Sequence, residues 1–374
     1  MTVPSRPMRI AFLGAGAFGI PTLDMLRQRH SIVAIITQPD KPSGRGKALT
    51  PTEVAQWAAI STPDVPVFKP ANINEPDAMT AIRAVAGPAQ VDAWVIIAFG
   101  QKLSDQLLEG IWAINLHGSL LPRWRGAGPV QAAVLAGDAH SGNSAITIAQ
   151  RMDAGLVLGQ SQRALEPHTT SGELHDLLSA DGPALIDDVL SQRATGTTAG
   201  VQQDESLVTR ARKLSKADAW VDFNDTAEAC RRRVNGLNPW PGVVVKFRGE
   251  PLKLLRATTV LDDIPQSAMA QVQSHQHAPR PAGQIIAGAT GLIACAQGGV
   301  LRICEVQLPG KRAMNWSAFA NGIKIAGFPP DDPQFQLIAG RLETSPPPAA
   351  PCPSSTPVAS ETAATEPTPP AMTP

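Results

Sequence analysis

The stretch RIAFLGAGAFGI, residues 9–20, decides the fold class of this chain. Its apolar first half predicts a buried strand, and GAGAFG at 14–19 fits the G-x-G-x-x-G pattern of a tight turn into a helix. A second apolar run, SIVAII at 31–36, follows the expected helix at 19–29. A strand, a glycine turn, a helix and a second strand in this order predict a parallel βαβ unit.

The same glycine pattern raises the question of a bound dinucleotide. In nicotinamide enzymes an acidic residue about 20 residues beyond the glycines binds the ribose. Asp40 lies 21 residues after Gly19, but it stands in QPDKP, beyond the second strand. Glycines here also serve simply to let a strand, a turn and a helix pack closely. We therefore expect no nicotinamide cofactor.

Short apolar runs alternate with helix-like stretches up to about residue 192. This alternation predicts an α/β fold with a Rossmann-like, mostly parallel sheet that is covered on both faces. VDAWVIIAFG at 91–100 and AINLHGSLLP at 113–122 each contain a strand and the loop that follows it. Ligands of such sheets bind beyond the carboxyl ends of the strands. We expect the functional site where these loops meet.

From about residue 207 the pattern changes to short apolar runs that are separated by turns, which predicts a small OB-like β-barrel domain. The C-terminal tail is rich in Pro, Ser, Thr and Ala and has too little apolar surface to order itself, so we expect a disordered segment. The expected divisions are an α/β domain at 1–194, a linker at 195–210, a barrel at 211–329 and the tail at 330–374.

The charge of the chain is uneven, although 32 basic and 32 acidic residues balance overall. Residues 207–330 carry 16 basic and 8 acidic residues, a net charge of +8. A basic half is typical of a surface that binds a polyanion, although an ordinary solvated surface gives the same count. No apolar run approaches the roughly 20 residues that span a bilayer, so we expect no membrane partner.

The cysteines give no sign of a metal site. None of them has the spacing of metal ligands, which indicates reduced thiols of a cytoplasmic protein and no bound metal. The four are Cys230, Cys295, Cys304 and Cys352.

The segment INLHGSLLPRWRG, residues 114–126, carries the most chemistry. Asn115 and His117 lie two apart after a strand, so both can point to one side of it. An amide and an imidazole together suit an oxyanion, and the imidazole also moves protons near neutral pH. Asp153 in MDAG could hold that imidazole charged or position a water. Each residue alone is also typical of a structural role, and together they indicate acyl or one-carbon transfer.

N-L-H-G-S-L-L-P-R-W-R-G-A-G-P, residues 115–129, resembles the signature of the methionyl-tRNA formyltransferases. Related folate-dependent formyltransferases, which act on glycinamide ribonucleotide or amino sugars, share Asn-x-His and SLLP. They typically have proline where this chain has Gly118, and they lack the R-W-R-G-A continuation. Further pieces resemble the family in order along residues 8–325. These are TQPDKPSGRGKALTPTEV at 37–54, LVTRARKLSKADAWVDF at 207–223 and LNPWPG at 237–242.

The resemblance implies a catalytic trio of Asn115, His117 and Asp153. Here A-Q-R-M-D-A-G replaces the family's D-x-G-L-D-T-G, so an earlier acid and glycine are missing. Asp153 is identified by its separation of eleven residues from Gly142, which is also the family's separation. The resemblance further implies a folate site and a basic loop for tRNA. The folate site comprises Ala98, Phe99, Gly100, Ser119, Leu120, Leu121 and Pro122, and the tRNA loop contains Arg45 and Lys47.

The activity implied by the resemblance is a formyl transfer from 10-formyltetrahydrofolate to the α-amine of methionine on initiator methionyl-tRNA, as needed for translation initiation. The protein is then expected to be a cytoplasmic monomer whose partners are that tRNA and the folate. Two alternatives stay open: a formyltransferase for another amine, such as an amino sugar or a nucleotide, and a relative that binds folate or RNA without activity.

Overall fold

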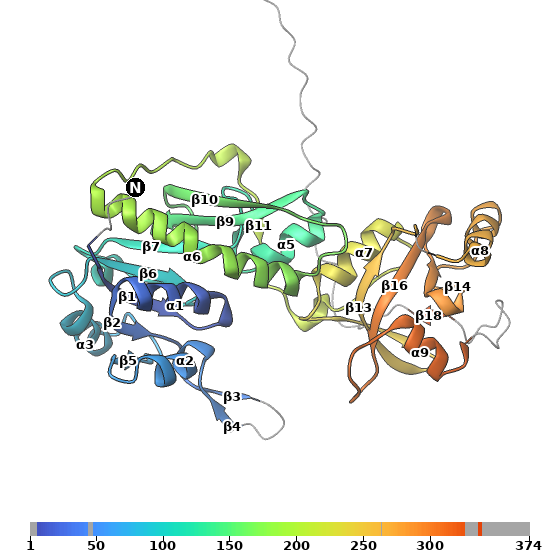
Figure 1. Cartoon of the computed structure of the whole chain (residues 1–374), viewed down its shortest axis with the longest axis horizontal. Helices are drawn as coiled ribbons and strands as arrows, with labels where there is room; N and C mark the ends of the chain where they lie inside the picture. The colour runs from blue at the N-terminus through green and yellow to red at the C-terminus, as the bar shows by residue number, and fades with distance from the viewer. Residues whose placement is uncertain (1–5, 44–47, 263, 326–335, 339–374) are drawn as a thin grey trace, which may run out of the picture. The chain divides into compact units, whose positions relative to one another are not determined.

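The computed structural model describes residues 6–43, 48–262, 264–325 and 336–338. Within these ranges the chain forms a mostly parallel α/β sheet followed by an antiparallel barrel, which confirms the predicted fold class (Figure 1). No helix in the described ranges is long and apolar enough to cross a membrane.

The first sheet has seven strands in the order β10-β9-β7-β6-β1-β2-β5. The five strands from β7 to β5 run parallel to one another, whereas β9 and β10 add antiparallel at one edge. The strands are β1 (Arg9–Gly14), β2 (Ser31–Ile36), β5 (Val67–Phe68), β6 (Ala93–Ile97), β7 (Ala113–His117), β9 (His140–Thr147) and β10 (Val157–Ala164).

Strand alternation divides the apolar side chains of this sheet between two core clusters. Ile10 and Phe12 pack into one cluster, and Ala11 and Leu13 into the other. Both faces are therefore buried, as a parallel sheet with helices on each side requires. The first cluster includes residues of α1 (Ile20–Arg29), α2 (Glu53–Ser61), α5 (Pro129–Ala136) and α6 (Ser171–Thr195), and the second includes residues of α3 (Pro76–Ala86) and α4 (Asp105–Leu108).

The glycines of GAGAFG have a packing reason. A Cβ on Gly14 would lie 2.6 Å from a ring carbon of Phe12 and 2.8 Å from the Ile97 carbonyl oxygen. A Cβ on Gly19 would lie 2.9 Å from the same Phe12 ring. Close approach of the turn to β1 and β6 thus requires glycine at both positions. Asp40, the acidic residue beyond β2, pairs with Lys69 at 2.6 Å.

The segment that follows α6 runs back against the first sheet. Val201 and Val157 exchange two backbone hydrogen bonds of 2.9 and 2.8 Å beside β10. Further on, β11 (Arg210–Ala211) pairs in parallel with β8 (Arg125–Gly126). The predicted linker is therefore hydrogen-bonded to the α/β sheet before the chain enters the barrel. The boundaries of the predicted domains remain a prediction.

The second sheet is antiparallel in the order β14-β15-β16-β13-β12-β18, and β17 also pairs with β16. A bridge between Gln284 and Gln336 joins the two ends of this order, so the sheet closes as a barrel. Its strands are β12 (Val243–Phe247), β13 (Glu250–Thr258), β14 (Ile285–Ala287), β15 (Leu292–Ala294), β16 (Val300–Gln307), β17 (Met314–Asn315) and β18 (Leu337–Ile338), with helices α7 (Ala227–Gly236), α8 (Gln266–His277) and α9 (Trp316–Gly322).

The strand β18 lies inside the range predicted as a disordered tail, and this part of the prediction needs correction. Leu337 is only 1 % exposed and belongs to the barrel core. Its amide donates to the Gly283 carbonyl oxygen at 2.8 Å. An apolar pair, Leu337 and Ile338, is enough to add an edge strand because the barrel supplies the partners. The rest of the predicted tail lies outside the described residues.

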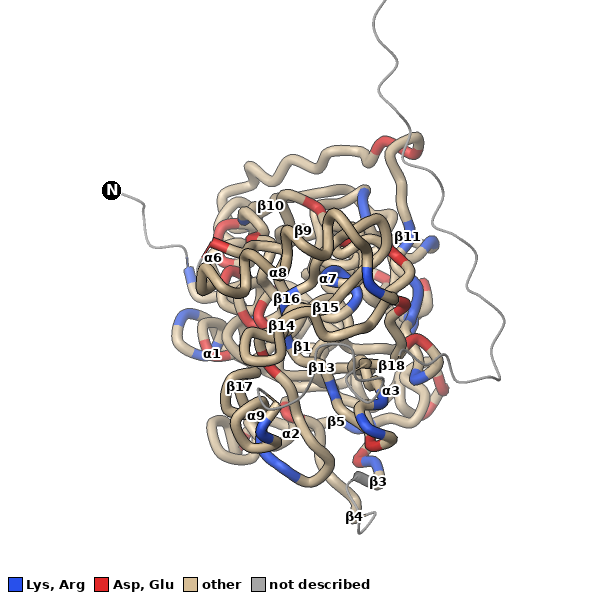
Figure 2. The backbone as a smooth tube through the Cα atoms, turned by 90° about the vertical axis from the view of Figure 1, so that its right-hand side faces the viewer, with Lys and Arg blue, Asp and Glu red and all other residues tan. Residues whose placement is uncertain are grey.

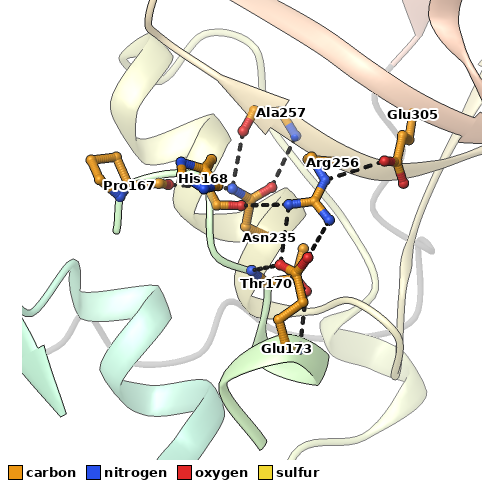
Figure 3. A network of polar contacts seen from close by, with 8 residues as sticks. All are labelled: Pro167, His168, Thr170, Glu173, Asn235, Arg256, Ala257 and Glu305. Atoms are coloured by element: carbon orange, nitrogen blue, oxygen red, sulfur yellow. Dashed lines mark hydrogen bonds and ion pairs between the residues drawn. The ribbon is translucent and has the colours of Figure 1, made fainter. Parts of the chain in front are cut away.

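One polar cluster connects the start of α6 with α7, β13 and β16 (Figure 3). We call it the barrel cluster and define it as Thr170, Glu173, Asn235, Arg256 and Glu305. The Arg256 guanidinium donates to both carboxylate oxygens of Glu173 and to the His168 carbonyl oxygen, and its Nε lies 3.4 Å from Glu305. Asn235 is fully buried and exchanges hydrogen bonds of 3.0 and 2.9 Å with the Ala257 backbone.

The basic residues of the second half stand among acidic ones. Figure 2 shows blue and red segments interspersed along much of the backbone. Within the described ranges, Arg212 pairs with Asp218, and both Arg231 and Arg232 pair with Glu228. Some of the 16 basic residues are therefore engaged in ion pairs with acidic residues of the same half, and the net charge of +8 is unchanged by these pairs. Arg231 is buried, so it belongs to the structure of α7 and not to a surface.

Candidate active site

Strand β7 places Asn115 and His117 on one face of the sheet. Ile114 and Leu116 alternate with these two residues along the strand. They point to the other face of the sheet, into the core cluster that contains Ile10 and Phe12. His117 is the last residue of β7 and pairs with Ser144 of β9, whereas Asn115 pairs with Ile146. The amide and the imidazole therefore come from the carboxyl end of a central strand, as the sequence predicts. Asn115 is partly exposed, and its side chain makes no hydrogen bond within the described residues.

The His117 ring is held between a backbone carbonyl and a carboxylate. Its Nε2 lies 2.9 Å from the Trp124 carbonyl oxygen, and its Nδ1 lies 3.6 Å from Oδ1 of Asp153. A carbonyl oxygen only accepts, so Nε2 carries the hydrogen of that bond. The 3.6 Å separation is longer than a hydrogen bond, which leaves Nδ1 as the ring nitrogen that is not bound. The ring is 7 % exposed.

Asp153 reaches His117 from the turn between β9 and β10. Its Oδ2 accepts a hydrogen bond of 2.8 Å from the Gly126 amide. Its backbone has φ = 54°, a left-handed conformation that Asp tolerates better than most residues. The segment A-Q-R-M-D-A-G differs from the family's D-x-G-L-D-T-G motif, but it still places a carboxylate beside the imidazole. The structure brings His117 and Asp153 together, and their catalytic role remains a prediction.

The same turn makes a very close contact at Gly155. A Cβ there would lie 1.7 Å from the Thr147 carbonyl oxygen. Real Cβ atoms do not approach backbone oxygens so closely, so only glycine fits without movement of β9 or of the turn. Gly155 thus lets the chain return beside the end of β9, which sets the position of Asp153 two residues earlier.

The SLLP segment is fixed by its own hydrogen bonds. The Ser119 hydroxyl donates to the Arg123 carbonyl oxygen at 2.7 Å, and Ser144 Oγ bonds both the Ser119 carbonyl oxygen and the Leu121 amide. Ser119 and Leu121 are buried, whereas Leu120 and Pro122 are partly exposed. Of the predicted folate residues in this segment, Leu120 and Pro122 therefore present more side chain to a ligand.

The AFG turn ends β6 next to the end of β7. Ala98 and Gly100 are exposed and have positive φ values of 51° and 82°. Phe99 is buried in the core, and its carbonyl oxygen accepts from Gln38 Nε2 at 2.9 Å. This turn therefore offers backbone and little side chain, which suits a ligand edge that is matched by backbone groups.

The predicted tRNA residues Arg45 and Lys47 lie outside the described residues. The flanking strands β3 (Lys41–Ser43) and β4 (Ala48–Thr50) are described and pair with each other antiparallel.

A separate cavity of about 680 Å³ lies between β10 and α6. Gln160, Arg163, Asp181 and Asp188 are among its lining residues, and Arg163 pairs with Asp181 at 2.7 Å. None of the trio Asn115, His117 and Asp153 lines this cavity, so it is distinct from the candidate active site. Within the described residues, no group of three or more His, Cys, Asp and Glu side chains could hold a metal ion.

Residue-based reasoning missed a polar group behind Asp153, buried at Arg125 and Gln203 and exposed at Glu205, because its members come from distant segments. We call it the linker cluster and define it as Arg125, Asp153, Gln203 and Glu205. Arg125 in PRWRG was compatible with a plain surface residue, yet it is only 4 % exposed and bonds Gln203 and Glu205. The sequence held no signal that distinguishes Arg125 from the exposed Arg123 two residues earlier.

Comparison with known proteins places these features in a family. The family model "Formyl transferase" matches residues 8–190, and "Formyl transferase, C-terminal domain" matches residues 213–324. The methionyl-tRNA formyltransferase of Methylococcus capsulatus is 37 % identical over 86 % of this chain and 98 % of its own length. The methionyl-tRNA formyltransferase of Hydrogenovibrio crunogenus is 34 % identical over 86 % of this chain and 98 % of its own length.

Solved structures share the fold at low identity. HypX from Aquifex aeolicus in complex with tetrahydrofolic acid superposes with a TM-score of 0.55 at 14 % identity, over 86 % of this chain and 48 % of that longer chain. WlaRD, a sugar 3N-formyl transferase crystallised with dTDP and 5-N-formyl-THF, gives 0.55 at 12 % identity, over 82 % of this chain and all of that one.

The two family matches and the curated relatives define a one-carbon transferase built on a mostly parallel sheet. The chain belongs to the formyl transferase family, and the curated relatives named above are methionyl-tRNA formyltransferases. The family resemblance predicted from the sequence motifs and the assignment as a formyltransferase enzyme are confirmed.

Proposed function

We propose that this protein transfers a formyl group from 10-formyltetrahydrofolate to the α-amine of methionine on initiator methionyl-tRNA. The observation that carries this proposal is the approach of Asp153 to His117 at the end of β7, in a chain whose relatives with that name match nearly full length. The fold neighbours that hold tetrahydrofolate compounds support a folate donor, and their low identity limits that support to the fold.

The reaction needs an electrophile held against three polar groups. The neutral amine attacks the formyl carbon, a C–N bond forms, and the carbonyl oxygen becomes negative. Collapse breaks the bond to N10 of the folate, and the proton lost by the amine ends on N10. The amide of Asn115 donates to the oxyanion, a contact worth about 3–4 kcal/mol for one good donor.

His117 acts through Nδ1 in this arrangement. Its Nε2 is bound to the Trp124 carbonyl oxygen, which orients the ring and sets which nitrogen faces the site. Nδ1 lies beside Asp153 without being hydrogen-bonded to it. Nδ1 therefore faces the position of the oxyanion, and an N–H at this atom donates to it. Asp153 also accepts the amine proton, directly or through a water.

The folate lies against the SLLP and AFG segments. The exposed backbone of Ala98 and Gly100 and the partly exposed Leu120 and Pro122 provide the contacts for its pterin. Phe99, Ser119 and Leu121 hold these segments in place from the interior. The reaction requires no metal, because the donor is already activated.

The tRNA approaches from the side of the linker. Arg210, Lys213 and Lys216 are exposed, and Arg210 belongs to β11, which pairs with β8 next to the Asp153 contact. Basic side chains at this position bind the phosphates of the tRNA acceptor arm. Arg45 and Lys47 contribute from the hairpin between β3 and β4. The protein acts as a monomer in the cytoplasm, where initiator tRNA is charged.

The test is a competition among acceptors with the purified full-length chain and 10-formyltetrahydrofolate. Charged initiator methionyl-tRNA is offered together with free methionine, glycinamide ribonucleotide and a nucleotide amino sugar. Formylation of the tRNA alone supports the proposal. Formylation of a small amine supports formyl transfer but overturns tRNA as the acceptor. If no acceptor is formylated and folate still binds, the protein is a relative that has lost activity.

A further inference from the structure

We propose that Gln203, in the segment between α6 and the barrel, is a positioning residue that sets the geometry of Asp153 against His117. This inference rests on the proposed function, because it assigns Gln203 a role in the same reaction. Gln203 is 4 % exposed, and its side chain lies behind the turn that carries Asp153.

The amide of Gln203 uses both its donor and its acceptor group in the linker cluster. Its Nε2 donates to the carbonyl oxygens of Asp153 and Gly155, each at 2.8 Å. Its Oε1 accepts from Nε of Arg125 at 2.9 Å. One neutral group thus holds two carbonyl oxygens of a tight turn at a single point. Such a saturated, buried contact is costly to break, because each polar group left behind stays in the interior without a partner.

The Asp153 turn needs this support. Asp153 has a left-handed backbone, and its carboxylate must satisfy the Gly126 amide while it faces the imidazole. A rotation of the 153–155 backbone would move Oδ1 away from Nδ1 of His117. Because the carbonyl oxygens of residues 153 and 155 are both held by Gln203, that rotation is resisted directly beside the reacting groups.

Contacts at three residues hold the segment around Gln203 in place: at Val201, at Gln203 itself and at Glu205. Two residues earlier, Val201 is bridged to Val157 at the start of β10. Arg125 comes from β8 and also bonds Glu205, which in turn pairs with Arg151 of the Asp153 turn. The position of Asp153 is therefore determined by the chain that leads into the barrel, and the proposed tRNA-binding half is connected to the reacting carboxylate through Gln203.

The decisive variant is Gln203→Glu, which keeps the size of the side chain and an acceptor for Arg125. An ionised carboxylate cannot donate, so the two carbonyl oxygens lose their partner. The matched control is Gln202→Glu, which makes the same chemical change at the exposed neighbouring residue. We expect Gln203→Glu to lower kcat by about 10- to 100-fold with KM values for folate and tRNA within about twofold, and Gln202→Glu to leave both unchanged.

A double mutant separates positioning from general damage. If Gln203 acts through Asp153, its replacement adds less than about a twofold loss of kcat in an Asp153→Asn background. The proposal is overturned if Gln203→Glu lowers kcat by the same factor in the Asp153→Asn background as in the wild type. It is also overturned if Gln203→Glu alone leaves kcat unchanged. Thermal unfolding of both Gln variants is recorded alongside, because melting temperatures well above the assay temperature show that each variant is folded when kcat is measured.

Amide hydrogen exchange over residues 148–156 provides a readout that does not depend on activity. Faster exchange there in Gln203→Glu, and not in Gln202→Glu, supports the positioning role, and equal exchange in the two variants overturns it. If the wild-type chain formylates no acceptor, the proposed function fails, and the exchange result still decides the role of Gln203 in holding the turn.

Discussion

The linker cluster and the barrel cluster both attach the chain that follows α6 to earlier residues, but they differ in burial. Arg125 and Gln203 of the linker cluster are each 4 % exposed. In the barrel cluster the side chains of Glu173 and Glu305 are 45 % and 43 % exposed, and Arg256 is 22 % exposed. Glu205 at the rim of the linker cluster is 48 % exposed, so water and salt screen the ion pairs at both sites and hardly reach the contact between Arg125 and Gln203.

This difference predicts different responses to mutation. Breaking a buried contact leaves polar groups without a partner, whereas breaking an exposed ion pair returns both groups to water. The Arg125–Gln203 contact of the linker cluster should therefore control local geometry strongly and respond little to salt. The barrel cluster should contribute less, and its contribution should depend on pH and ionic strength.

The largest effect is expected at the centre of the linker cluster. Asp153→Asn keeps the shape of the side chain and tolerates the left-handed backbone, but it removes the carboxylate beside Nδ1 of His117. We expect kcat to fall about 1000-fold, equivalent to about 4 kcal/mol, with little change in folate binding. Steady-state kinetics checks this against Asp64→Asn, an exposed control. A loss below tenfold contradicts the proposed role.

A second prediction concerns the turn that the linker cluster supports. Gly155→Ala places a methyl group against the Thr147 carbonyl oxygen, so β9 or the turn must move. We expect a loss of about 3 kcal/mol in unfolding free energy together with a large loss of activity. Thermal unfolding checks it, with Gly322→Ala as control because no atom lies within 4 Å of a Cβ there. Equal melting temperatures of the two variants would show that the turn relaxes freely.

A matched pair of arginine substitutions compares the clusters directly. Arg125→Met leaves the buried Gln203 Oε1 without its donor, whereas Glu205 keeps Arg151, and we expect a loss of about 2–3 kcal/mol that changes little with salt. Arg256→Met removes an exposed contact to Glu173, and we expect a loss of about 1 kcal/mol that shrinks at 1 M salt. Denaturant unfolding of both variants at two salt concentrations measures this. The reverse order of losses would contradict the comparison.

The smallest predicted effect is the pH dependence of the barrel cluster. Burial raises the pKa of Glu173, but hydrogen bonds from Arg256 and Thr170 outweigh it and hold the pKa below its ordinary value of 4.5. A lowered pKa in the folded state stabilises the protein above pH 4.5, and this contribution is lost as the pH falls through the lowered value.

The variant Glu173→Gln tests this, because glutamine keeps the size and the position of the capping contact to Thr170. Its unfolding free energy should be lower than that of the wild type by no more than about 1 kcal/mol above pH 5.5. The difference should shrink as the pH falls below 4.5 and through the lowered pKa of Glu173. Thermal melts across pH 3.5–7 measure it, and a difference that persists at acid pH would assign Glu173 a role other than the ion pair.

Much of the fold followed from the sequence pattern. The apolar run before GAGAFG predicted β1, and the loops after β6 and β7 were expected to meet at one edge. The tail boundary was placed too early, because two apolar residues, Leu337 and Ile338, are too short a signal for a strand that depends on barrel partners. The linker segment was expected as a connection only, and its contacts with the Asp153 turn had no local signature.

The sequence by itself determined which residues are available for the chemistry. The alternation along β7 sets Asn115 and His117 on one face, and the motif order identifies the family. Only the tertiary structure decided how they are used: which nitrogen of His117 is bound, that Asp153 reaches the other, and that Gln203 holds the turn. Periodicity acts between neighbouring residues, whereas Gln203 lies 50 residues beyond Asp153 and meets it only when the chain returns beside β10.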